Sequence, residues 1–561
     1  MIHTNEIIIK LIATSDVHGC IFPYDYINRQ PLEGSLARVF TYIKNENIRY
    51  DGQVVLLDNG DILQGQPTCY YNNYVNTEQP NLAARVYNYM GYDAQTIGNH
   101  DVETGHPVYD KWIAECDFPM LGANVIDAHA GRPYLQPYTI VERSGIRIAV
   151  LGLLTAAIPH WLHHDLWHGL RFEEMTATAR HWTKVIRERE HPDLLVGLFH
   201  SGKEGGITTP DYEENATQHV VSAVEGFDLV FYGHDHLSHN DWIDSPSGHR
   251  VLCLAPSSNA HLVAEAEVRF DPASHALRSM RGGLRSVKSY TPDPDFTRYF
   301  QPDADQVKTY IERIIGRFAH PLYTRDCYFG SAPLTDFIHD VQLKVTGADI
   351  SLNAPLTFDT RIKAGDVRIS DLFNLYKYEN QIYVLRMTGH EIHQLLEMSY
   401  GLWVGTMHSP DDHIILLSES DTSTGKRYLF DNLAFNFESA AGIDYEVDVT
   451  RPRGERVHIM QMSNGEPFSA ERWYHVAMNS YRGNGGGELL TKGAGIPFEQ
   501  IAERIVYRSE HDQRYYLMHE IEEKRELDPQ AHDNWHFVPE TWARPALERD
   551  KKLLFGGDVM T

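Results

Sequence analysis

The sequence predicts a two-domain α/β protein, and three observations lead to this prediction. The chain has 561 residues, which is too many for one ordinary hydrophobic core. Its first half alternates short apolar runs with longer amphipathic stretches, a pattern typical of strands and helices in α/β layers. Near residue 285 the composition changes to a segment rich in proline and aspartate, and a second unit is predicted beyond it.

Six apolar runs of the first half are predicted to form strands. Helices are predicted between them, for example at residues 175–190. The six runs are EIIIKLIA (6–13), QVVLLD (53–58), AQTIG (94–98), IRIAVLGLL (146–154), LLVGLFH (194–200) and DLVFYGH (228–234).

The second half opens with a connecting helix, predicted at residues 307–318. Beyond it, an amphipathic helix is predicted in APLTDFIHDVQLKV (332–345), and strands in QIYVLRM (381–387), IILLS (414–418) and WYHVAMNS (473–480). We expect a first domain at 1–290, a linker with the connecting helix at 291–325, a second domain at 326–510 and a C-terminal extension at 511–561. No chemistry is assigned to the extension.

Composition and charge exclude several classes of function. The 50 lysines and arginines against 77 acidic residues give a net charge of −27, which repels nucleic-acid polymers. The five cysteines are scattered and form no C-x-x-C pair, so neither a thiolate metal site nor a disulfide framework is predicted. No apolar run reaches membrane-spanning length. The N-terminus shows no export signal, so we expect a cytoplasmic protein, or a periplasmic or extracellular one if a signal was removed.

Five of the six apolar runs end in potential metal ligands. In open α/β sheets ligands bind beyond the carboxyl ends of the strands, so these segments can converge. Taken singly, each has a structural alternative, such as a helix cap or a turn. Five such strand ends, one after another along the chain, favour a metal site. The candidate ligands are Asp16, His18, Asp61, Asn99, His200, His234 and His236.

The types of side chain indicate which metals would bind. Aspartate, asparagine and histidine without cysteine suit divalent manganese, zinc, iron or magnesium. A carboxylate such as Asp61 can bridge two ions, and two ions about 3.5–4 Å apart clamp the attacking and leaving oxygens of a phosphoryl displacement. The sequence therefore predicts two divalent metal ions.

The order D-x-H, G-D, G-N-H-[DE], a lone histidine and G-H-x-H resembles the signature of calcineurin-like metallophosphoesterases, over roughly residues 7–270. The resemblance implies a four-layer α/β/β/α domain. It also implies that His100 contacts the phosphoryl group and stabilises the charge that develops there. It assigns Asp16, His18, Asp61 and His236 to one ion, and Asp61, Asn99, His200 and His234 to the other.

Two details near these motifs stay open. The resemblance places the carboxylate that orients His100 at Glu103, but Asp101 is adjacent to the histidine and is an alternative. The segment HWLHHDLWH has the histidine density of a metal site, yet it falls in a loop that varies in the family. Packing is therefore the favoured interpretation of its four histidines, His160, His163, His164 and His168.

The second half resembles the α/β C-terminal domain of 5′-nucleotidases, and more closely that of 2′,3′-cyclic-nucleotide phosphodiesterase/3′-nucleotidases. The segments that carry this resemblance are ADISLNAPLTF (348–358), DLFNLYKYEN (371–380), GIDYEVDVT (442–450) and NSYRGNGGGE (479–488). It implies that Phe435 and Tyr481 sandwich a base and that Asn353 and Asn380 contact substrate. Aromatic rings beside a glycine-rich loop make a plausible stacking platform, although such rings are more often part of a core.

We therefore expect a dimetal phosphohydrolase whose substrate is a small nucleotide. The leading substrates are 2′,3′-cyclic nucleotides and 3′-nucleotides, because NAPLTF lacks the arginines that 5′-nucleotidases carry after this asparagine. The alternatives are 5′-nucleotides or nucleotide sugars, an unrelated ester such as a thiosulfate conjugate, and a non-catalytic binding protein on the same fold. No nucleic-acid or membrane partner is expected, and the sequence leaves the oligomeric state open.

Overall fold

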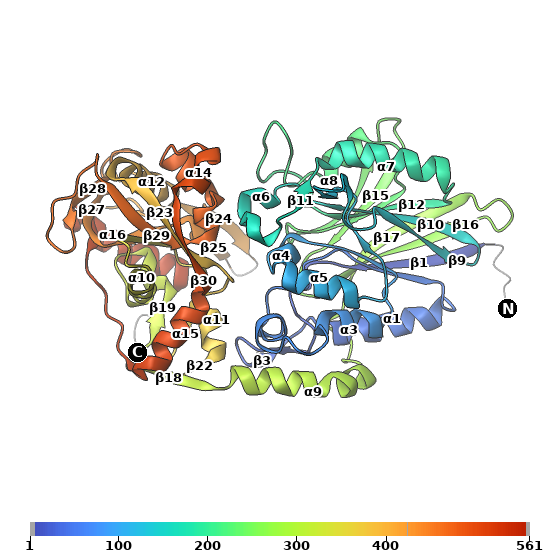
Figure 1. Ribbon diagram of the computed structural model, residues 1–561, viewed down its shortest axis with the longest axis horizontal. Coiled ribbons are helices and arrows are strands. Elements are labelled where there is room, and N and C mark those ends of the chain that lie inside the picture. The colour runs from blue at the N-terminus through green and yellow to red at the C-terminus, as the bar shows by residue number, and fades with distance from the viewer. Residues whose placement is uncertain (1–5, 423–424, 557–561) are drawn as a thin grey trace. The chain divides into compact units, whose positions relative to one another are not determined.

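The computed structural model describes residues 6–422 and 425–556 and contains two compact units, Met1–Ile311 and Glu312–Thr561 (Figure 1). Each unit has its own sheets and its own buried apolar core. The two units are described separately below.

Two six-stranded sheets form the centre of the first unit. In each sheet a block of parallel strands carries antiparallel strands at its edge, and all six predicted strands are confirmed. The first sheet has the order β17 (Leu277–Ser286), β16 (Leu262–Phe270), β1 (Ile7–Thr14), β4 (Val54–Asp58), β5 (Ala94–Thr96), β6 (Met120–Leu121). The second has the order β14 (Ser238–Asp244), β15 (Arg250–Pro256), β13 (Leu229–Tyr232), β12 (Leu194–His200), β10 (Ile146–Leu154), β9 (Tyr138–Arg143).

The two sheets pack face to face and are covered by helices on their outer faces (Figure 1). Alternate residues of β1 point in opposite directions, so Leu11 lies between the sheets with Leu198 and Phe231, while Ile12 faces the helices. This arrangement confirms the four-layer α/β/β/α fold. The first sheet is covered by α1 (Leu36–Arg49), α3 (Leu82–Met90), α5 (His106–Glu115) and α9 (Pro294–Ile311), and the second by α7 (Met175–Arg189) and α8 (Thr217–Ala223).

The connecting helix predicted at 307–318 is wrong in its position. Helix α9 ends at Ile311, and it buries Phe296 and Phe300 in the core of the first unit, so it is not part of a linker. Residues Ile314–Phe318 instead form β18, between β22 (Gly365–Arg368) and β31 (Glu526–Leu527). The physical reason is the pairing of these residues with two strands that are distant in the chain. Gly316 also contributes. Glycine disfavours helix, and a Cβ at this position would come within 2.9 Å of the Ile521 carbonyl oxygen, so only glycine permits this close approach.

A five-stranded sheet forms the centre of the second unit, with helices on both faces. Residues of β23 (Gln381–Thr388) alternate between the two faces: Ile382 and Val384 pack toward Val345 of α10 (Pro333–Thr346), whereas Leu385 joins the larger core with α12 (Gly389–Trp403). The predicted helix at 332–345 and the strands at 381–387 and 473–480 are confirmed. The strand order is β26 (Ser439–Ala441), β20 (Ile350–Asn353), β29 (Trp473–Asn479), β23 (Gln381–Thr388), β30 (Ile505–Asp512).

Two other expectations for this unit need correction. Of IILLS only the last two residues enter a strand, β24 (Leu417–Thr422), because Ile414 and Ile415 are held in a loop by the Asp550 carboxylate. The predicted extension at 511–561 is an integral part of the unit through its described residues. Strand β32 (Trp535–Val538) pairs in parallel with β27 (Ile443–Asp448), and α16 (Glu540–Phe555) buries Ala546 in the main core. The remaining residues, 557–561, lie outside the described part.

Candidate dimetal centre

All seven predicted metal ligands lie at the carboxyl ends of strands in the first unit. Asp16 and His18 follow β1, Asp61 follows β4, and Asn99 begins the short helix α4 (Asn99–Val102) after β5. His200 is the last residue of β12, and His234 and His236 follow β13. These strands run parallel within each sheet, so each sheet presents its ligands at one edge.

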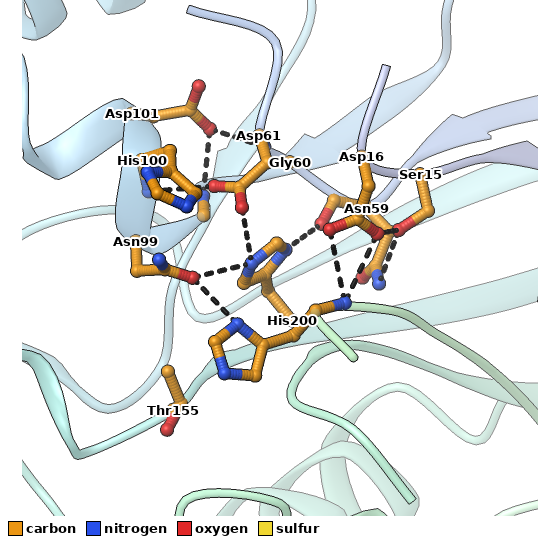
Figure 2. A network of polar contacts seen from close by, with 12 residues as sticks. Ser15, Asp16, Asn59, Gly60, Asp61, Asn99, His100, Asp101, Thr155 and His200 are labelled. Carbon is orange, nitrogen blue, oxygen red and sulfur yellow. Dashed lines mark hydrogen bonds and ion pairs between the residues drawn. The ribbon is translucent and has the colours of Figure 1, made fainter. Parts of the chain in front are cut away.

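The ligands meet in two groups. Asp16, His18 and His236 each offer a ligand atom, and these atoms lie within 4.8 Å of one another; the same holds for Asp61, His200 and His234. Figure 2 shows Asp61 and Asn99 pointing toward His200. The Oδ1 atom of Asn99 lies 3.0 Å from His200 Nε2 and 2.8 Å from His234 Nδ1, which places it in the second group.

The backbone at these ligands adopts a conformation that non-glycine residues rarely take. The φ angle is positive at five of the seven, Asp16 (50°), His18 (48°), Asp61 (60°), His234 (84°) and His236 (58°). Left-handed conformations cost energy and persist where the surrounding structure enforces them, often at functional sites.

Two glycines make the close packing of these loops possible. A Cβ at Gly98 would lie 2.1 Å from Asp61 Oδ1. A Cβ at Gly233 would lie 2.0 Å from Ser15 Oγ and 2.3 Å from Asp16 Oδ2. Because neither glycine has a Cβ, a neighbouring loop of the same chain can bring its carboxylate into the centre.

In three of the histidines, the ring nitrogen that faces away from the centre has a partner. His18 Nδ1 lies 3.2 Å from the Gln64 carbonyl oxygen, and His200 Nδ1 lies 2.6 Å from the Asn59 carbonyl oxygen. His234 Nε2 lies 3.1 Å from Glu214 Oε1. Such contacts select the tautomer whose other nitrogen carries the lone pair toward a metal. Sequence reasoning missed Glu214, because no local motif distinguishes it from the neighbouring acidic residues.

The electrostatics of the centre fit divalent cations. Asp61 is buried, and its Oδ2 atom lies 3.1 Å from Nε2 of His200, so a carboxylate oxygen and a ring nitrogen that could both bind a cation face each other. Burial would raise the pKa of Asp61, but the neighbouring histidines, His200 first, hold it well below its usual value. Burial likewise lowers the pKa of His200, and the Asp61 carboxylate outweighs this and raises it to about 10.

His100 stands beside this centre with a different set of contacts. Its backbone N–H donates to Asp61 Oδ1 at 2.8 Å, and its Nδ1 lies 2.6 Å from Glu103 Oε2. The side chain is 28% exposed, so the ring is accessible to a substrate. Burial would lower the pKa of His100, but the carboxylates of Asp61 and Glu103 outweigh it and raise the pKa to about 9.

The Asp101 carboxylate makes other contacts. Its two oxygens accept hydrogen bonds from four backbone N–H groups, those of Asp61, Ile62, Leu63 and Gly98, at 2.8–3.0 Å. This carboxylate therefore ties the loop after β4 to the loop after β5.

The predicted base-binding residues of the second unit also meet, although they are 46 positions apart in the chain. The rings of Phe435 and Tyr481 are 6.1 Å apart and edge to face, at an interplanar angle of 85°. Arg482 is buried, and it joins the two segments through Glu438 Oε1 at 2.6 Å and the Phe435 carbonyl oxygen at 3.3 Å. Stacking of a base between the two rings requires one of them to turn.

Asn353 and Asn380 lie close to these segments. Asn353 ends β20, is paired with Ser439 in the sheet, and is fully buried. Neither polar atom of its side chain has a hydrogen-bond partner among the described residues. Asn380 is buried next to Gln381, whose N–H donates to the hydroxyl of Ser480 beside Tyr481.

The four histidines at 160–168 do not form a third group. Within residues 6–422 and 425–556, the only groups of three or more candidate ligands are the two described above. His160 contacts the Tyr212 hydroxyl, and His163 pairs with Asp165. The ring of Trp161 in this segment lies 5.4 Å from the ring of His234.

Comparison with known proteins agrees with this geometry. Residues 9–238 match the calcineurin-like phosphoesterase family, and residues 314–492 match the 5′-nucleotidase C-terminal domain. The chain is a two-domain calcineurin-like phosphoesterase. Membership implies divalent metal ions at the centre, while their identity stays a prediction.

Several relatives of this phosphoesterase share its whole length. It is 24% identical to the trifunctional nucleotide phosphoesterase protein YfkN of Bacillus subtilis over 95% of this chain, which is only 39% of the Bacillus protein. It is also 24% identical to the 2′,3′-cyclic-nucleotide 2′-phosphodiesterase/3′-nucleotidase of Haemophilus influenzae, over 96% of this chain and 88% of the relative.

Solved structures agree on the fold of this phosphoesterase. A crystal structure from Staphylococcus aureus has a TM-score of 0.77 at 21% identity and covers 94% of this chain and 99% of its own. The 5′-nucleotidase precursor of Thermus thermophilus has a TM-score of 0.64 at 20% identity and covers 95% of this chain and 100% of its own. Among the described helices of this phosphoesterase, none is long and apolar enough to cross a membrane.

Proposed function

We propose that this phosphoesterase hydrolyses 2′,3′-cyclic nucleotides and 3′-nucleotides to nucleoside and phosphate with the help of two divalent metal ions. The observation that carries the proposal is the meeting of two separate groups of ligand atoms, one of which holds the buried carboxylate of Asp61 3.1 Å from His200 Nε2.

The choice of substrate rests on the second unit and on the relatives. A relative that aligns over nearly the whole chain is named for 2′,3′-cyclic and 3′-nucleotides. The segment NAPLTF after β20 points in the same direction, because it lacks the arginines of the 5′-nucleotidase pattern. Hydrolysis of 5′-nucleotides or nucleotide sugars is the second candidate, supported by relatives named 5′-nucleotidase over 35–40% of this chain.

The proposed ligands would bind two separate ions. In this proposal Asp16, His18 and His236 hold one ion, Asn99, His200 and His234 hold the other, and Asp61 serves both. When bound, the ions supply Lewis acidity, which polarises the phosphoryl group and makes a water acidic enough to attack near neutral pH.

The remaining residues of the centre act on the substrate through His100. Its exposed ring donates a hydrogen bond to the phosphoryl oxygens, where negative charge increases in the transition state. Glu103 accepts from Nδ1–H, which fixes the ring orientation. Because the pKa of His100 is raised to about 9, the ring keeps a second proton at Nε2, which is the donor toward the substrate. Asp101 holds the two ligand loops in place through their backbone N–H groups.

Base recognition is assigned to the second unit. Phe435 and Tyr481 are half-buried, and each offers a ring face to any of the four bases. The buried amide of Asn353 supplies a donor and an acceptor for polar groups of the ligand. Asn380 is buried next to Gln381, which contacts Ser480 beside Tyr481.

A substrate panel tests the proposal. The protein is reconstituted separately with manganese, zinc, iron or magnesium, and its bound metal is counted. Adenosine 2′,3′-cyclic phosphate, 3′-AMP, 5′-AMP, a nucleotide sugar and bis-p-nitrophenyl phosphate are then compared by kcat/KM. We expect two ions per chain and the highest values for the first two substrates.

Each other outcome has a definite meaning. A preference for 5′-AMP or the nucleotide sugar would replace the proposal by its second candidate. Hydrolysis of the base-free ester alone would leave a dimetal esterase with no nucleotide function. Two bound ions without turnover of any substrate would show a binding protein on this fold.

A further inference from the structure

Glu214 contacts the dimetal centre from a loop that the sequence motifs do not include. Its Oε1 atom lies 3.1 Å from Nε2 of His234, and the two side chains are 17% and 11% exposed. His234 Nδ1 faces Asn99 Oδ1 at 2.8 Å, so the two nitrogens of this ring face opposite partners. The carboxylate accepts a hydrogen bond from Nε2–H, which leaves the lone pair of Nδ1 directed into the second ligand group.

The loop holds Glu214 in place by backbone contacts. Its N–H donates to the Ile207 carbonyl at 2.8 Å, and its own carbonyl accepts from the hydroxyls of Thr155 at 2.9 Å and Ser201 at 2.8 Å. The second carboxylate oxygen, Oε2, accepts from the Ile207 N–H at 2.7 Å. These contacts orient the carboxylate independently of any ion.

The packing beside Glu214 shows that this orientation is built into the loop. A Cβ at Gly206 would lie 2.5 Å from Glu214 Oε2, so only glycine at this position leaves room for the carboxylate. Gly206 has a φ of 89°, a conformation that also favours glycine.

The outward-facing nitrogen of His234 contacts a carboxylate, which distinguishes it from the corresponding nitrogens of His18 and His200. His18 and His200 each contact a neutral backbone carbonyl, of Gln64 and Asn59 respectively. Only the His234 ring is backed by a carboxylate among these three. A carboxylate partner makes the imidazole a stronger donor than a carbonyl partner does, because it stabilises the positive charge that the ring shares with a metal.

The carboxylate behind His234 offsets a difference in negative charge between the two ligand groups. In the proposed function Asp61 serves both ions, so the first ion would face the carboxylates of Asp16 and Asp61, whereas the second would face Asp61 and the neutral amide of Asn99. With Glu214 included, each ion has two carboxylates close to it.

We propose that Glu214 is a positioning residue for the second metal ion: it fixes the tautomer of His234 and supplies a second negative charge beside this group of ligands. The inference rests on the dimetal centre of the proposed function. It predicts that one ion depends on Glu214 and that the other does not.

Glu214→Gln tests this assignment, because glutamine keeps the shape of the side chain and removes its charge. The affinity of the metal-free protein for manganese and for zinc is measured by titration calorimetry, and the bound metal is counted after gel filtration. Loss of an outer partner typically weakens metal binding about 10- to 100-fold. We expect this loss for one ion only, with the affinity of the other changed less than about threefold.

The neighbouring residue provides a matched control. Glu213 carries the same charge one position away, but its Oε1 atom pairs with Nδ1 of His219 at 3.1 Å, outside the ligand groups. Glu213→Gln should leave both affinities as in the unmodified protein. Thermal unfolding without metal should be the same for all three proteins, whereas the increase in Tm on adding metal should be smaller for Glu214→Gln alone.

Any of three results would overturn the inference. Unchanged affinity for both ions in Glu214→Gln would show that the carboxylate has no influence on metal binding. Equal weakening of both ions, or a lower Tm of the metal-free variant, would assign Glu214 to the stability of its loop. These measurements use no nucleotide, and failure of the unmodified protein to bind two ions would count against the proposed function, not against the role of Glu214.

Discussion

Glu103 and Asp101 are two carboxylates near His100. The structure predicts that neutralising Glu103 lowers the rate, whereas neutralising Asp101 lowers the stability and the metal affinity. In Glu103→Gln the amide oxygen still accepts from His100 Nδ1, but the charge is lost from a 2.6 Å contact. A hydrogen bond to a charged group is worth about 1.5–3 kcal/mol, against about 0.5–1.5 kcal/mol for a neutral one. The difference, about 1–1.5 kcal/mol, corresponds to roughly a tenfold decrease in kcat. Metal content and stability should not change.

In Asp101→Asn the damage is to the scaffold. Each oxygen of this buried carboxylate accepts from two backbone N–H groups, so an NH₂ group in place of either oxygen leaves two donors unsatisfied. At about 1–3 kcal/mol for each buried unsatisfied group, the loss of stability is about 2–6 kcal/mol. Because the donors belong to Asp61 and its neighbours, metal binding should weaken as well.

The assay compares both variants in parallel for bound metal, urea unfolding and kcat with bis-p-nitrophenyl phosphate. That substrate lacks a base, so the comparison does not depend on the nucleotide preference. The reasoning is refuted if Asp101→Asn keeps its metal and stability but loses rate while Glu103→Gln keeps its rate, because Asp101 would then be the orienting carboxylate.

Four further changes have distinct expected results. Asp61→Asn should abolish turnover and lower the number of bound ions; two ions with a near-normal rate would show that it does not bridge them. His100→Ala should lower kcat about 10²–10³-fold with metal retained. If this variant loses as much metal as Asn99→Ala, His100 is a metal ligand. Phe435→Ala and Tyr481→Ala should lower kcat/KM about 5- to 150-fold for 3′-AMP and barely change it for bis-p-nitrophenyl phosphate; equal losses would make the rings structural. Burial lowers the pKa of His339 to about 3, so its folded form stays neutral while the unfolded form takes up a proton below pH 6.5. Stability from this group is complete above pH 6.5 and decreases by about 1.4 kcal/mol per pH unit as the pH falls toward 3. The difference in unfolding free energy between His339→Gln and the unmodified protein should therefore shift by about 2 kcal/mol in favour of the variant from pH 6.5 to pH 5, and a constant difference would disprove it.

Much of the first unit was predictable from the sequence because its signals are local. A buried parallel strand is a short apolar run, and the polar residue that follows it stands at the carboxyl edge of the sheet. Asp16, Asp61, His200 and His234 were found in this way. The rule needs no knowledge of which strands are neighbours, since every parallel strand of a sheet ends at the same edge.

The limits of such local signals appear at 307–318. The apolar spacing there suits a helix, yet α9 ends at Ile311 and Ile314–Phe318 pairs as a strand with segments about 50 and 210 residues away. The energy that decides between the two comes from those partners, and no window of local sequence contains them.

The sequence by itself determined where the strands of the first unit lie along the chain and which polar residues follow them as candidate ligands, because both depend on residue type and on position relative to a strand end. Only the tertiary structure decided how the carboxylates are used. Asp101 is adjacent to His100 in the chain, but its oxygens accept from the backbone of a different loop, while Glu103, one helical turn further, contacts the ring. Glu214 lies 20 residues before His234 and touches it through a loop held by Thr155 and Ser201. A carboxylate has the same chemistry wherever it occurs, and its role is set by the donors that the fold places within hydrogen-bond distance.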